Sequence, residues 1–596
     1  MSLLALSQAK VVPFGITLTW ETAAPDGFGR KVILTNGQLP GPPLYVNQGD
    51  DVQFLVKNKL PFELTIHFHG IDQIGTPWSD GVPGISQRPI KPGQSYLYQW
   101  NANEYGSYFY HAHDKAHIDD GLFGAIYVQP ASNVQKPFNL ITNNHADLEA
   151  IIQAEQKTQP IFLSDWTHLT SAERHAAQIA TGLDSWCTNS LLINGKGSAI
   201  CLDQETINAN TNPLILPFLN GITYTDLGCL PPTLSFFQGD YPHNFSAEPF
   251  GLWSGCKASQ GPTEVLTVSI KDKWVSYDII SATSTQTLVF SIDEHPLWVY
   301  AIDGRYVTPT IADALTIANG QRYSVMVQLK AQPIPKYTVR AVVSGVNQIL
   351  GGTAFLSYGS VHTKGSTEAS SKPYITLTGA NATTDTIFLN ESLAGPFLPV
   401  APAKTVDETY TLSIGRANGS YLWKMENDSF PYSLDREEPL LFNPNELAKH
   451  NLSDLTIRTK NGSWVDLIVL PQGPVQPPHP LHKHSNKFYV IGSGMGIWNF
   501  SSVAEAMEVM PESFNLINPP IRDTYPTPLV LGGAEAWIVY RYQVVNPGAF
   551  LFHCHIQDHL DGGMAVALID GYDVWPHVPE QYLRNNGFPL GSHHRA

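Results

Sequence analysis

An all-β architecture of several domains is the fold class that this sequence predicts, and three observations support it. Short stretches alternate apolar and polar residues, as in residues 51–56 and 323–329, and a period of two is that of a half-buried strand. Turn pairs separate such stretches, among them Asn36-Gly37, Asp303-Gly304 and Asn319-Gly320. Glycine and proline number 47 and 45 of 596 residues, which favours sandwiches or barrels with many turns.

The chain is too long for a single core, and its length predicts about three or four domains. Helical periodicity is scarce, and residues 171–180 are the best short helical candidate. Histidine-rich motifs lie in the first and last 120 residues, and a Ser/Thr/Gly-rich stretch at 362–372 is typical of a linker. We therefore expect domains at residues 1–150, 151–375 and 376–596.

Composition and charge exclude several classes of partner. The chain is 43% apolar and only 15% charged, as in a folded protein, and its formal net charge is −17. Such a charge disfavours nucleic acids and anionic membranes. No apolar stretch approaches the roughly 18 residues of a membrane helix. The apolar run at Leu3–Leu6 is too short for a full signal-peptide core, so no signal peptide is clearly present.

The cysteines and sequons indicate an oxidising, extracellular compartment. Four cysteines fall in one segment, namely Cys187, Cys201, Cys229 and Cys256. They predict two disulfides with three possible connectivities, while the alternative of a zinc site lacks any C-x-x-C pair. Asn-X-Ser/Thr sequons occur at Asn244, Asn381, Asn390, Asn418, Asn427, Asn451, Asn461 and Asn499. This density is typical of a secreted or cell-wall glycoprotein.

Ten of the 21 histidines fall into four clusters. The clusters are His67-Phe68-His69, His111-Ala112-His113, His479-Pro480-Leu481-His482-Lys483-His484, and His553-Cys554-His555 with His559. A His-x-His pair on a strand presents two imidazoles on one face, where two metal ions can share them.

The cysteine at 554 would face the opposite side of the same strand, so one strand can serve two metal sites. Cys554, two histidines (His479 and His559) and a weak axial Met564 form the ligand set of a blue-copper electron-transfer site. The remaining eight histidines would suffice for three further metal ions. A packed core residue is the alternative interpretation of Met564.

The four clusters resemble the motifs of the multicopper oxidases, which are H-x-H-G, H-x-H, H-P-x-H-x-H and H-C-H-x-x-x-H in that order. Framework stretches at residues 78–83, 120–122 and 192–195 also match. The resemblance spans the whole chain and is greatest to the fungal (ascomycete) laccase-like members, which have three cupredoxin domains.

The resemblance implies four copper ions. Three of them would form a cluster between the first and third domains, and the fourth, the type 1 copper, would be bound separately. His479, Cys554 and His559 would bind the type 1 copper, with Met564 as the axial ligand. His67 and His482 would bind the type 2 copper. The type 3 pair would be held by His69, His111, His113, His484, His553 and His555.

The implied reaction is the one-electron oxidation of a small phenolic or aromatic donor at His559, coupled to the reduction of O2 to water by a monomeric enzyme. Asp80 matches a family residue that relays protons near the type 2 copper, although Ser-Asp-Gly is also ordinary turn chemistry. Asp120 resembles a residue that orients a ligand.

Three departures from the family pattern leave the donor open. Gln557, followed by Asp558, stands where many relatives have an acidic relay residue. Asn189 replaces an Asp that engages phenols in basidiomycete-type laccases, and Val475 replaces an Asp of iron-oxidising relatives.

Ferroxidase activity, with Glu173 or Asp184 supplying carboxylates, and bilirubin oxidase-like activity are therefore alternatives. A non-catalytic copper protein is a further alternative, but it predicts eroded ligands and every motif position here is filled.

Overall fold

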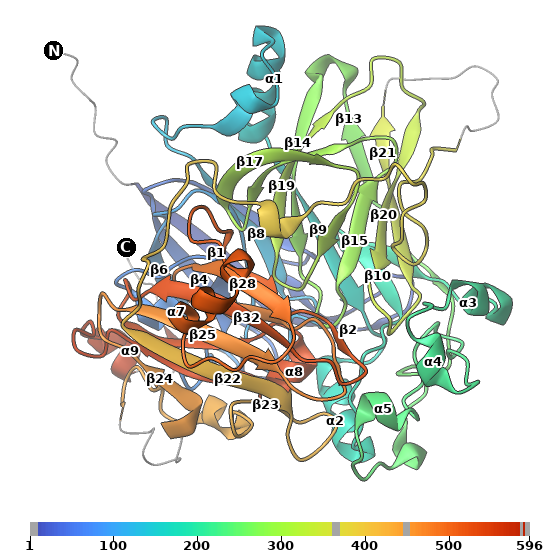
Figure 1. The fold of residues 1–596 in the computed structure, drawn as a ribbon. Coiled ribbons are helices and arrows are strands. Elements are labelled where there is room, and N and C mark those ends of the chain that lie inside the picture. Colours follow the sequence, from blue (N-terminus) through green and yellow to red (C-terminus); the bar gives the residue numbers. More distant parts are fainter. Residues whose placement is uncertain (1–9, 360–369, 445–452, 585–587, 590–596) are drawn as a thin grey trace.

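Strands dominate the computed structural model of the chain, which describes residues 10–359, 370–444, 453–584 and 588–589 (Figure 1). Strands make up 39% of the structure and helices 14%, so the predicted all-β class is confirmed. The run at Leu3–Leu6, most of the expected linker at 362–372 and the sequon at Asn451 lie outside the described residues.

Two sheets of the first 130 residues, joined by one late strand, enclose a shared apolar core. Their strands are β1 (Val11–Ala23), β2 (Arg30–Thr35), β3 (Gly41–Asn47), β4 (Asp51–Asn58), β5 (Ile66–His69), β6 (Gln94–Asn101), β7 (Gly106–Ala112), β8 (Phe123–Gln129) and β35 (Phe588–Pro589). One sheet has the order β2-β1-β4-β6-β35 and the other β3-β8-β7-β5. Every second residue of β4, namely Val52, Phe54 and Val56, is buried in this core, as the alternating pattern predicts.

The middle of the chain forms a second pair of sheets. Its strands are β9 (Gln159–Trp166), β10 (Ser190–Ile193), β11 (Lys196–Ala199), β12 (Ser259–Gln260), β13 (Val265–Val268), β14 (Trp274–Ser281), β15 (Leu288–Ile292), β16 (Leu297–Ile302), β17 (Arg305–Ala312), β18 (Leu315–Ile317), β19 (Arg322–Gln328), β20 (Lys336–Val343) and β21 (Gly351–Tyr358). The orders are β12-β11-β10-β9-β14-β19-β16-β17 and β13-β21-β20-β15-β18. The predicted turn at Asp303-Gly304 joins β16 to β17 with positive φ at both residues, which the type I′ hairpin turn requires.

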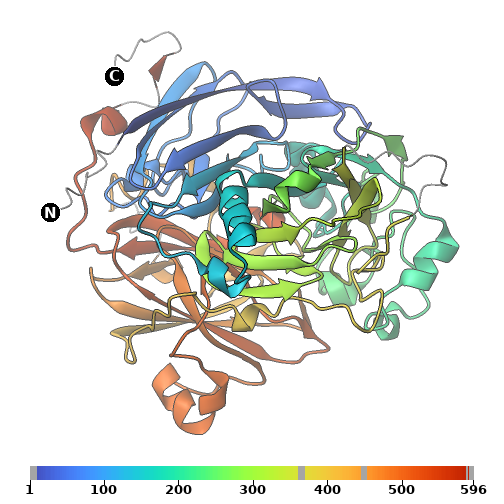
Figure 2. The ribbon, with the colours of Figure 1, turned by 90° about the horizontal axis from the view of Figure 1, so that it is seen from above.

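The last third of the chain repeats the two-sheet design. Its strands are β22 (Glu408–Arg416), β23 (Trp423–Met425), β24 (Thr456–Arg458), β25 (Trp464–Pro471), β26 (Val475–Gln476), β27 (Pro480–Lys483), β28 (Phe488–Met495), β29 (Ile521–Arg522), β30 (Thr524–Pro526), β31 (Val530–Leu531), β32 (Ala536–Gln543), β33 (Gly548–Cys554) and β34 (Ala565–Asp570). The two large sheets have the orders β23-β22-β25-β32-β28-β29 and β24-β34-β33-β27-β30. Figure 2 shows the first pair (blue) and the last pair (orange to red) lying side by side, with the middle pair (green to yellow) against both.

Short helices connect and cover the sheets. They are α1 (His145–Gln156), α2 (Ser171–Thr181), α3 (Gln204–Asn210), α4 (Leu216–Leu219), α5 (Ser235–Gln238), α7 (Val503–Val509), α8 (Gln557–Asp561) and α9 (Glu580–Arg584). The predicted helix at 171–180 is α2, which begins at a capping box between Thr170 and Glu173 and ends at the left-handed Gly182. No helix among the described residues is both long and apolar enough to cross a bilayer.

The two predicted disulfides are present and join Cys187 to Cys229 and Cys201 to Cys256. They tie the segment that carries α3, α4 and α5 to the middle pair of sheets, at whose side these helices lie in Figure 1. Cys554 is free and buried. The expected domain limits fall within α1 and at Ile375, which forms an isolated bridge with Asn381, and the three-domain division stays a prediction.

Candidate metal centre

Two pairs of antiparallel strands bring the four histidine clusters together. On the first pair of sheets, β5 pairs with β7 so that His67 lies opposite His111. On the last pair, β27 pairs with β33 so that His482 lies opposite His553. All ten predicted histidines are buried, although the two strand pairs lie more than 350 residues apart in the sequence.

Eight of these histidines form one continuous group between the first and last pairs of sheets. Three pairs of these histidines bring their Nε2 atoms close together. The Nε2–Nε2 distance is 3.1 Å between His484 and His553, 3.4 Å between His113 and His553, and 3.4 Å between His67 and His482. Three sets of ligand atoms each lie within 4.8 Å of one another. These sets are His67, His69 and His482; His69, His111 and His555; and His113, His484 and His553.

A second, smaller group consists of Cys554, His479 and His559. The Cys554 Sγ lies 3.7 Å from His479 Nδ1 and 3.6 Å from His559 Nδ1, and the two Nδ1 atoms are 3.1 Å apart. The main chain of Met564 joins this group, because its carbonyl accepts from the Cys554 N–H and its own N–H donates to the His559 carbonyl. Met564 is fully buried, and its role as axial ligand stays a prediction.

Strand β33 separates the two groups by its alternation. Cys554 belongs to the apolar core of the last pair of sheets together with Phe552 and Met564, whereas His553 and His555 join the eight-histidine group. Neighbouring residues of one strand thus face two different sites, as the period of two predicts.

Burial prepares these side chains for a metal ion. Desolvation lowers the pKa of His479 to about 3 and that of His553 to about 4, because a charged imidazole is disfavoured away from water. Neutral imidazole is the form that binds metal. Desolvation also raises the pKa of the Cys554 thiol, so a metal must displace its proton to bind the thiolate.

Several buried ring nitrogens in the eight-histidine group have no hydrogen-bond partner among the described residues. They are the His69 Nδ1, the His111 Nε2 and both ring nitrogens of His555. Buried polar atoms are seldom left unpaired, and these three histidines form one of the sets whose ligand atoms lie within 4.8 Å of one another. The imidazoles here and the imidazole-thiolate set at Cys554 therefore fit copper, which those ligand types favour.

Asp80 holds two histidines of the larger group. Its carboxylate accepts a hydrogen bond from His484 Nδ1 at 2.9 Å, and its main-chain carbonyl accepts from His67 Nδ1 at 2.7 Å. Asp80 is fully buried, so this residue is not a surface turn carboxylate. The carbonyl and carboxylate contacts direct the Nε2 atoms of both rings toward the group's interior.

Asp120 lies elsewhere. Its carboxylate accepts hydrogen bonds from Arg30 at 2.8 Å and from the Ser171 hydroxyl at 2.6 Å, at the N-terminus of α2. It therefore anchors α2. Its expected role in orienting a metal ligand stays a prediction, because these hydrogen bonds go to Arg30 and Ser171 and not to a metal-binding histidine.

The exposed edge of the smaller group is narrow. His559 is 5% exposed, and its Nε2 lies 3.9 Å from the Asp184 carboxylate. One face of the ring packs on Trp423, at 4.0 Å between ring centroids. Asp184 in turn accepts from Arg416 at 3.2 Å, and its main chain forms two hydrogen bonds with the Gln238 side chain of α5. The disulfide-linked helical segment thus covers this edge.

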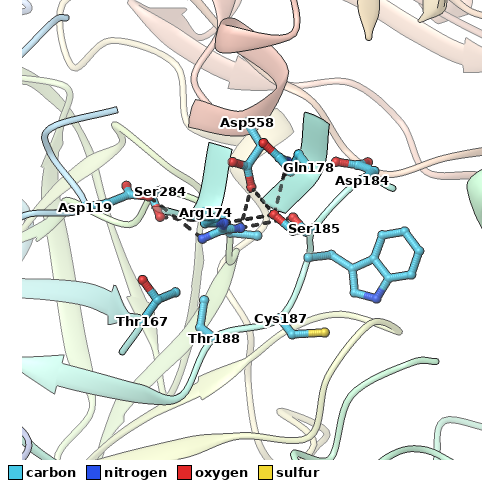
Figure 3. A network of polar contacts seen from close by, with 12 residues as sticks. Asp119, Thr167, Arg174, Gln178, Asp184, Ser185, Cys187, Thr188, Ser284 and Asp558 are labelled. Atoms are coloured by element: carbon cyan, nitrogen blue, oxygen red, sulfur yellow. Dashed lines mark hydrogen bonds and ion pairs between the residues drawn. The ribbon is translucent and has the colours of Figure 1, made fainter. Parts of the chain in front are cut away.

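A buried guanidinium fixes the loop between the two groups (Figure 3). Arg174 of α2 forms an ion pair with Asp558 of α8, and its Nε donates to Ser185 Oγ at 2.9 Å. Ser185 Oγ also donates to Asp558 at 3.0 Å. Because Asp558 directly precedes His559, α2 and the loop that follows it fix the helix that carries this histidine.

The positions that depart from the family pattern have other structural roles. Gln557 donates to the His555 carbonyl at 3.2 Å, Asn189 donates to the Gly251 carbonyl at 3.0 Å, and Val475 packs against an apolar cluster of the α3–α5 segment. The Glu173 carboxylate is used in the capping box of α2. Of the two acidic candidates for a donor contact, Asp184 alone lies beside His559.

A cavity of about 50 Å³ reaches the larger group from the side of α8. His113, Gln557, Asp435 and Asp561 are among its lining residues. This volume suits water and other small molecules, and it adjoins a histidine of the eight-histidine group.

Sequence reasoning missed Asp523, which contacts the larger group, Arg322, which binds Asp523, and Trp423, which packs on His559. None of these residues belongs to a motif. Asp523 lies 454 and 41 residues from the two histidines that it contacts, His69 and His482, so no local signal marks it.

Three comparisons place this chain among known proteins. Multicopper oxidase family models match residues 17–133, 157–360 and 423–573. The chain is 44% identical to Laccase abr2 of Aspergillus fumigatus over 96% of this chain and 97% of that protein. It is 40% identical to Multicopper oxidase MCE of Talaromyces pinophilus over 97% and 96% of the two chains.

Solved structures share the fold. The laccase from Botrytis aclada has a TM-score of 0.68 at 21% identity, covering 96% of this chain and 90% of that one. Fet3p, described as a multicopper oxidase that functions in iron import, has a TM-score of 0.64 at 21% identity, covering 96% and 94%. The predicted cupredoxin-like, all-β fold is thereby confirmed.

Proposed function

The chain belongs to the multicopper oxidase family, and from that premise we propose that it is a laccase-like enzyme that oxidises small phenolic or aromatic donors by single electrons and reduces O2 to water. One observation carries the proposal: a cysteine-centred group and an eight-histidine group share strand β33. Copper bound there supplies one-electron transfer at the first group and oxygen reduction at the second.

The geometry of the two groups supports the ligand assignment that the family resemblance implies. His479, Cys554 and His559, with Met564, would hold the type 1 copper. His67 and His482, whose Nε2 atoms face one another, would hold the type 2 copper. The type 3 pair would be held by two sets of three, namely His69, His111 and His555, and His113, His484 and His553.

Asp184 supports a donor with a hydroxyl group. Its Oδ1 has no hydrogen-bond partner among the described residues, and its other carboxylate oxygen lies 3.9 Å from His559 Nε2. This carboxylate is buried, so a phenolic hydroxyl must displace side chains that cover it before it can donate to it, and would then bring the donor ring to the edge of His559. Arg416 donates to the same carboxylate oxygen that lies near His559 and keeps it in place. In our proposal Asp184 takes the part that the family pattern would give to position 189.

The access route and the surroundings agree with a small donor and a secreted enzyme. The covering α3–α5 segment narrows the approach to His559, and the cavity at His113 suits entry of O2 and water. Two disulfides and the sequons support an extracellular location. Both the secretion and the monomeric state are part of this proposal.

A donor panel tests the proposal. The copper-loaded protein is assayed for O2 consumption with a methoxyphenol, ascorbate, bilirubin and Fe(II) in parallel. We expect the phenol to give the highest kcat/KM. Failure of every donor to support O2 consumption would refute the oxidase, and preference for Fe(II) would favour a ferroxidase instead.

Asp184→Asn is expected to lower kcat/KM for phenols by about 10-fold or more, because a site that bonds a substrate hydroxyl discriminates strongly. Oxidation of ferrocyanide, which has no hydroxyl, should change little. Glu173→Gln serves as the matched control, since its carboxylate caps α2 away from His559. Equal losses with both donors would show that Asp184 supports the site only structurally.

A further inference from the structure

Two aspartates make the same pair of contacts with the eight-histidine group. Asp80 holds His67 by its main-chain carbonyl and His484 by its carboxylate. Asp523 accepts from His482 Nδ1 by its main-chain carbonyl at 2.8 Å and from His69 Nε2 by its carboxylate at 3.2 Å. Each aspartate therefore orients one histidine of the facing pair, His67 and His482, and one further histidine.

The two carboxylates differ in what surrounds them. The Asp80 Oδ1 has no hydrogen-bond partner among the described residues. Both oxygens of Asp523 are bound by Arg322, each at 2.6 Å, and the Thr524 hydroxyl donates to one of them at 3.1 Å. A bidentate guanidinium fixes the plane of a carboxylate, so Asp523 cannot rotate away from His69.

Arg322 is itself fixed by main-chain carbonyls from two parts of the chain. It donates to Gly320 at 3.0 Å and to Ser107 at 3.3 Å, and its Nη1 lies 3.3 Å from the Asp303 carboxylate. The side chains of Arg322 and Asp523 are both 0% exposed. Such a buried pair adds little net stability over apolar residues, so stability alone does not account for it.

Besides Asp523, three neighbours confine the ring of His69. His482 stacks on it at 3.8 Å between centroids, and Phe109 stacks at 4.7 Å. At Gly320 an added Cβ would come within 2.7 Å of the His69 Cε1. Asp523 and Thr524 contact the Nε2 atom, which leaves Nδ1, buried and without a hydrogen-bond partner among the described residues, as the nitrogen free to bind metal.

We propose that Asp523, fixed by Arg322, is a positioning residue of the oxygen-reducing copper cluster, holding His69 as the tautomer whose Nδ1 binds metal. The inference rests on the proposed function and assigns a role to the middle pair of sheets, which supplies Arg322 from β19 although it carries no predicted copper ligand. A carboxylate behind a ligating histidine both selects its tautomer and fixes its direction.

Asp523→Asn tests this role, because the amide keeps the shape of the carboxylate and removes its charge. Copper content per chain and the magnetic coupling of the type 3 pair are measured after dialysis against a graded series of a copper chelator. We expect the cluster to lose copper at chelator concentrations about 10- to 100-fold lower than in the unmodified protein, while the blue absorption from the Cys554 site is retained.

Asp466→Asn is the matched control, because Asp466 forms an equally buried bidentate pair with Arg541, at 2.6 and 2.7 Å, and contacts no histidine of the group. If Asp523→Asn retained cluster copper as well as Asp466→Asn does, the inference would be overturned.

In a double variant, Asp523→Asn with Arg322→Met, the Asp303 carboxylate keeps its ion pair with Arg522 at 2.7 Å, so no buried charge is left unpaired. This variant is expected to fold yet to lose cluster copper as readily. Normal copper retention by the folded double variant would also refute the inference. Copper binding is read without a donor, so a protein that binds copper normally but oxidises nothing would refute the proposed function alone.

Discussion

Replacing Cys554 by serine is expected to abolish the blue absorption and to lower kcat/KM for every donor by more than about 100-fold. Loss of a residue that only orients a metal ligand costs about 10- to 100-fold, and loss of the ligand itself should cost more. The serine hydroxyl is a hard, weakly acidic ligand, whereas the type 1 site depends on a soft thiolate. The Cys554 Sγ lies 3.6–3.7 Å from both Nδ1 atoms of its group, and the other four cysteines are joined in disulfides, so no other thiol can take its place.

The control for this variant lies within the same molecule. Because the eight-histidine group faces the other side of β33, the magnetic signature of its copper ions should persist in Cys554→Ser while total copper falls. Absorption and magnetic spectra, together with steady-state O2 uptake, measure these effects. Retained blue colour would show that Cys554 does not bind the type 1 copper.

Copper removal is expected to make the protein acid-labile. Burial lowers the pKa of nine histidines of the two groups in the folded, metal-free chain. They are His69, His111, His113, His479, His482, His484, His553, His555 and His559. The unfolded chain binds protons at each of them below the ordinary histidine pKa of about 6.5.

The sign follows from this difference in bound protons. Stability is complete above about pH 6.5 and is lost as the pH falls toward the folded values, which are about 4 for His553 and about 3 for His479. Each such histidine lowers the free energy of unfolding by roughly 1.4 kcal/mol per pH unit in this window. His479 and His553 alone therefore lower the free energy of unfolding by about 3 kcal/mol per pH unit.

Denaturant unfolding of copper-free and copper-loaded protein between pH 7 and pH 5 measures this effect. Bound copper occupies the ring nitrogens that would take up protons, so the loaded protein should lose stability only at lower pH. Identical pH profiles for the two forms would contradict the assignment of these histidines as ligands.

The fold class and the histidine clusters were predictable because short local patterns in the sequence determine both. The alternation at residues 51–56 and 323–329 marks the strands β4 and β19, and the His-x-His spacing places two rings on one face. The capping residues Thr170 and Glu173 mark α2. The short helices α3 to α5 escaped prediction, because four to seven residues carry too little periodicity.

Contacts between distant segments were not predictable. The Arg322–Asp523 pair and the ion pair between Arg174 and Asp558 join residues separated by 201 and 384 positions, and only the packing of the sheets brings them together. The disulfide connectivity was open for the same reason. Asp184 was named as a possible carboxylate without a location, and its place beside His559 depends on the loop after α2.

The pairing of β27 with β33 sets His482 opposite His553 and Leu481 opposite Cys554. Since alternate residues face opposite sides, one residue added between Phe552 and His553 would turn the thiol toward the histidines and an imidazole toward the apolar core. A substitution in this strand damages one copper site, but a shift of one position disables both at once. The number of residues in β33 is therefore constrained more strongly than the identity of its apolar side chains. Among related chains, insertions and deletions should be absent from β33 even where its apolar residues vary.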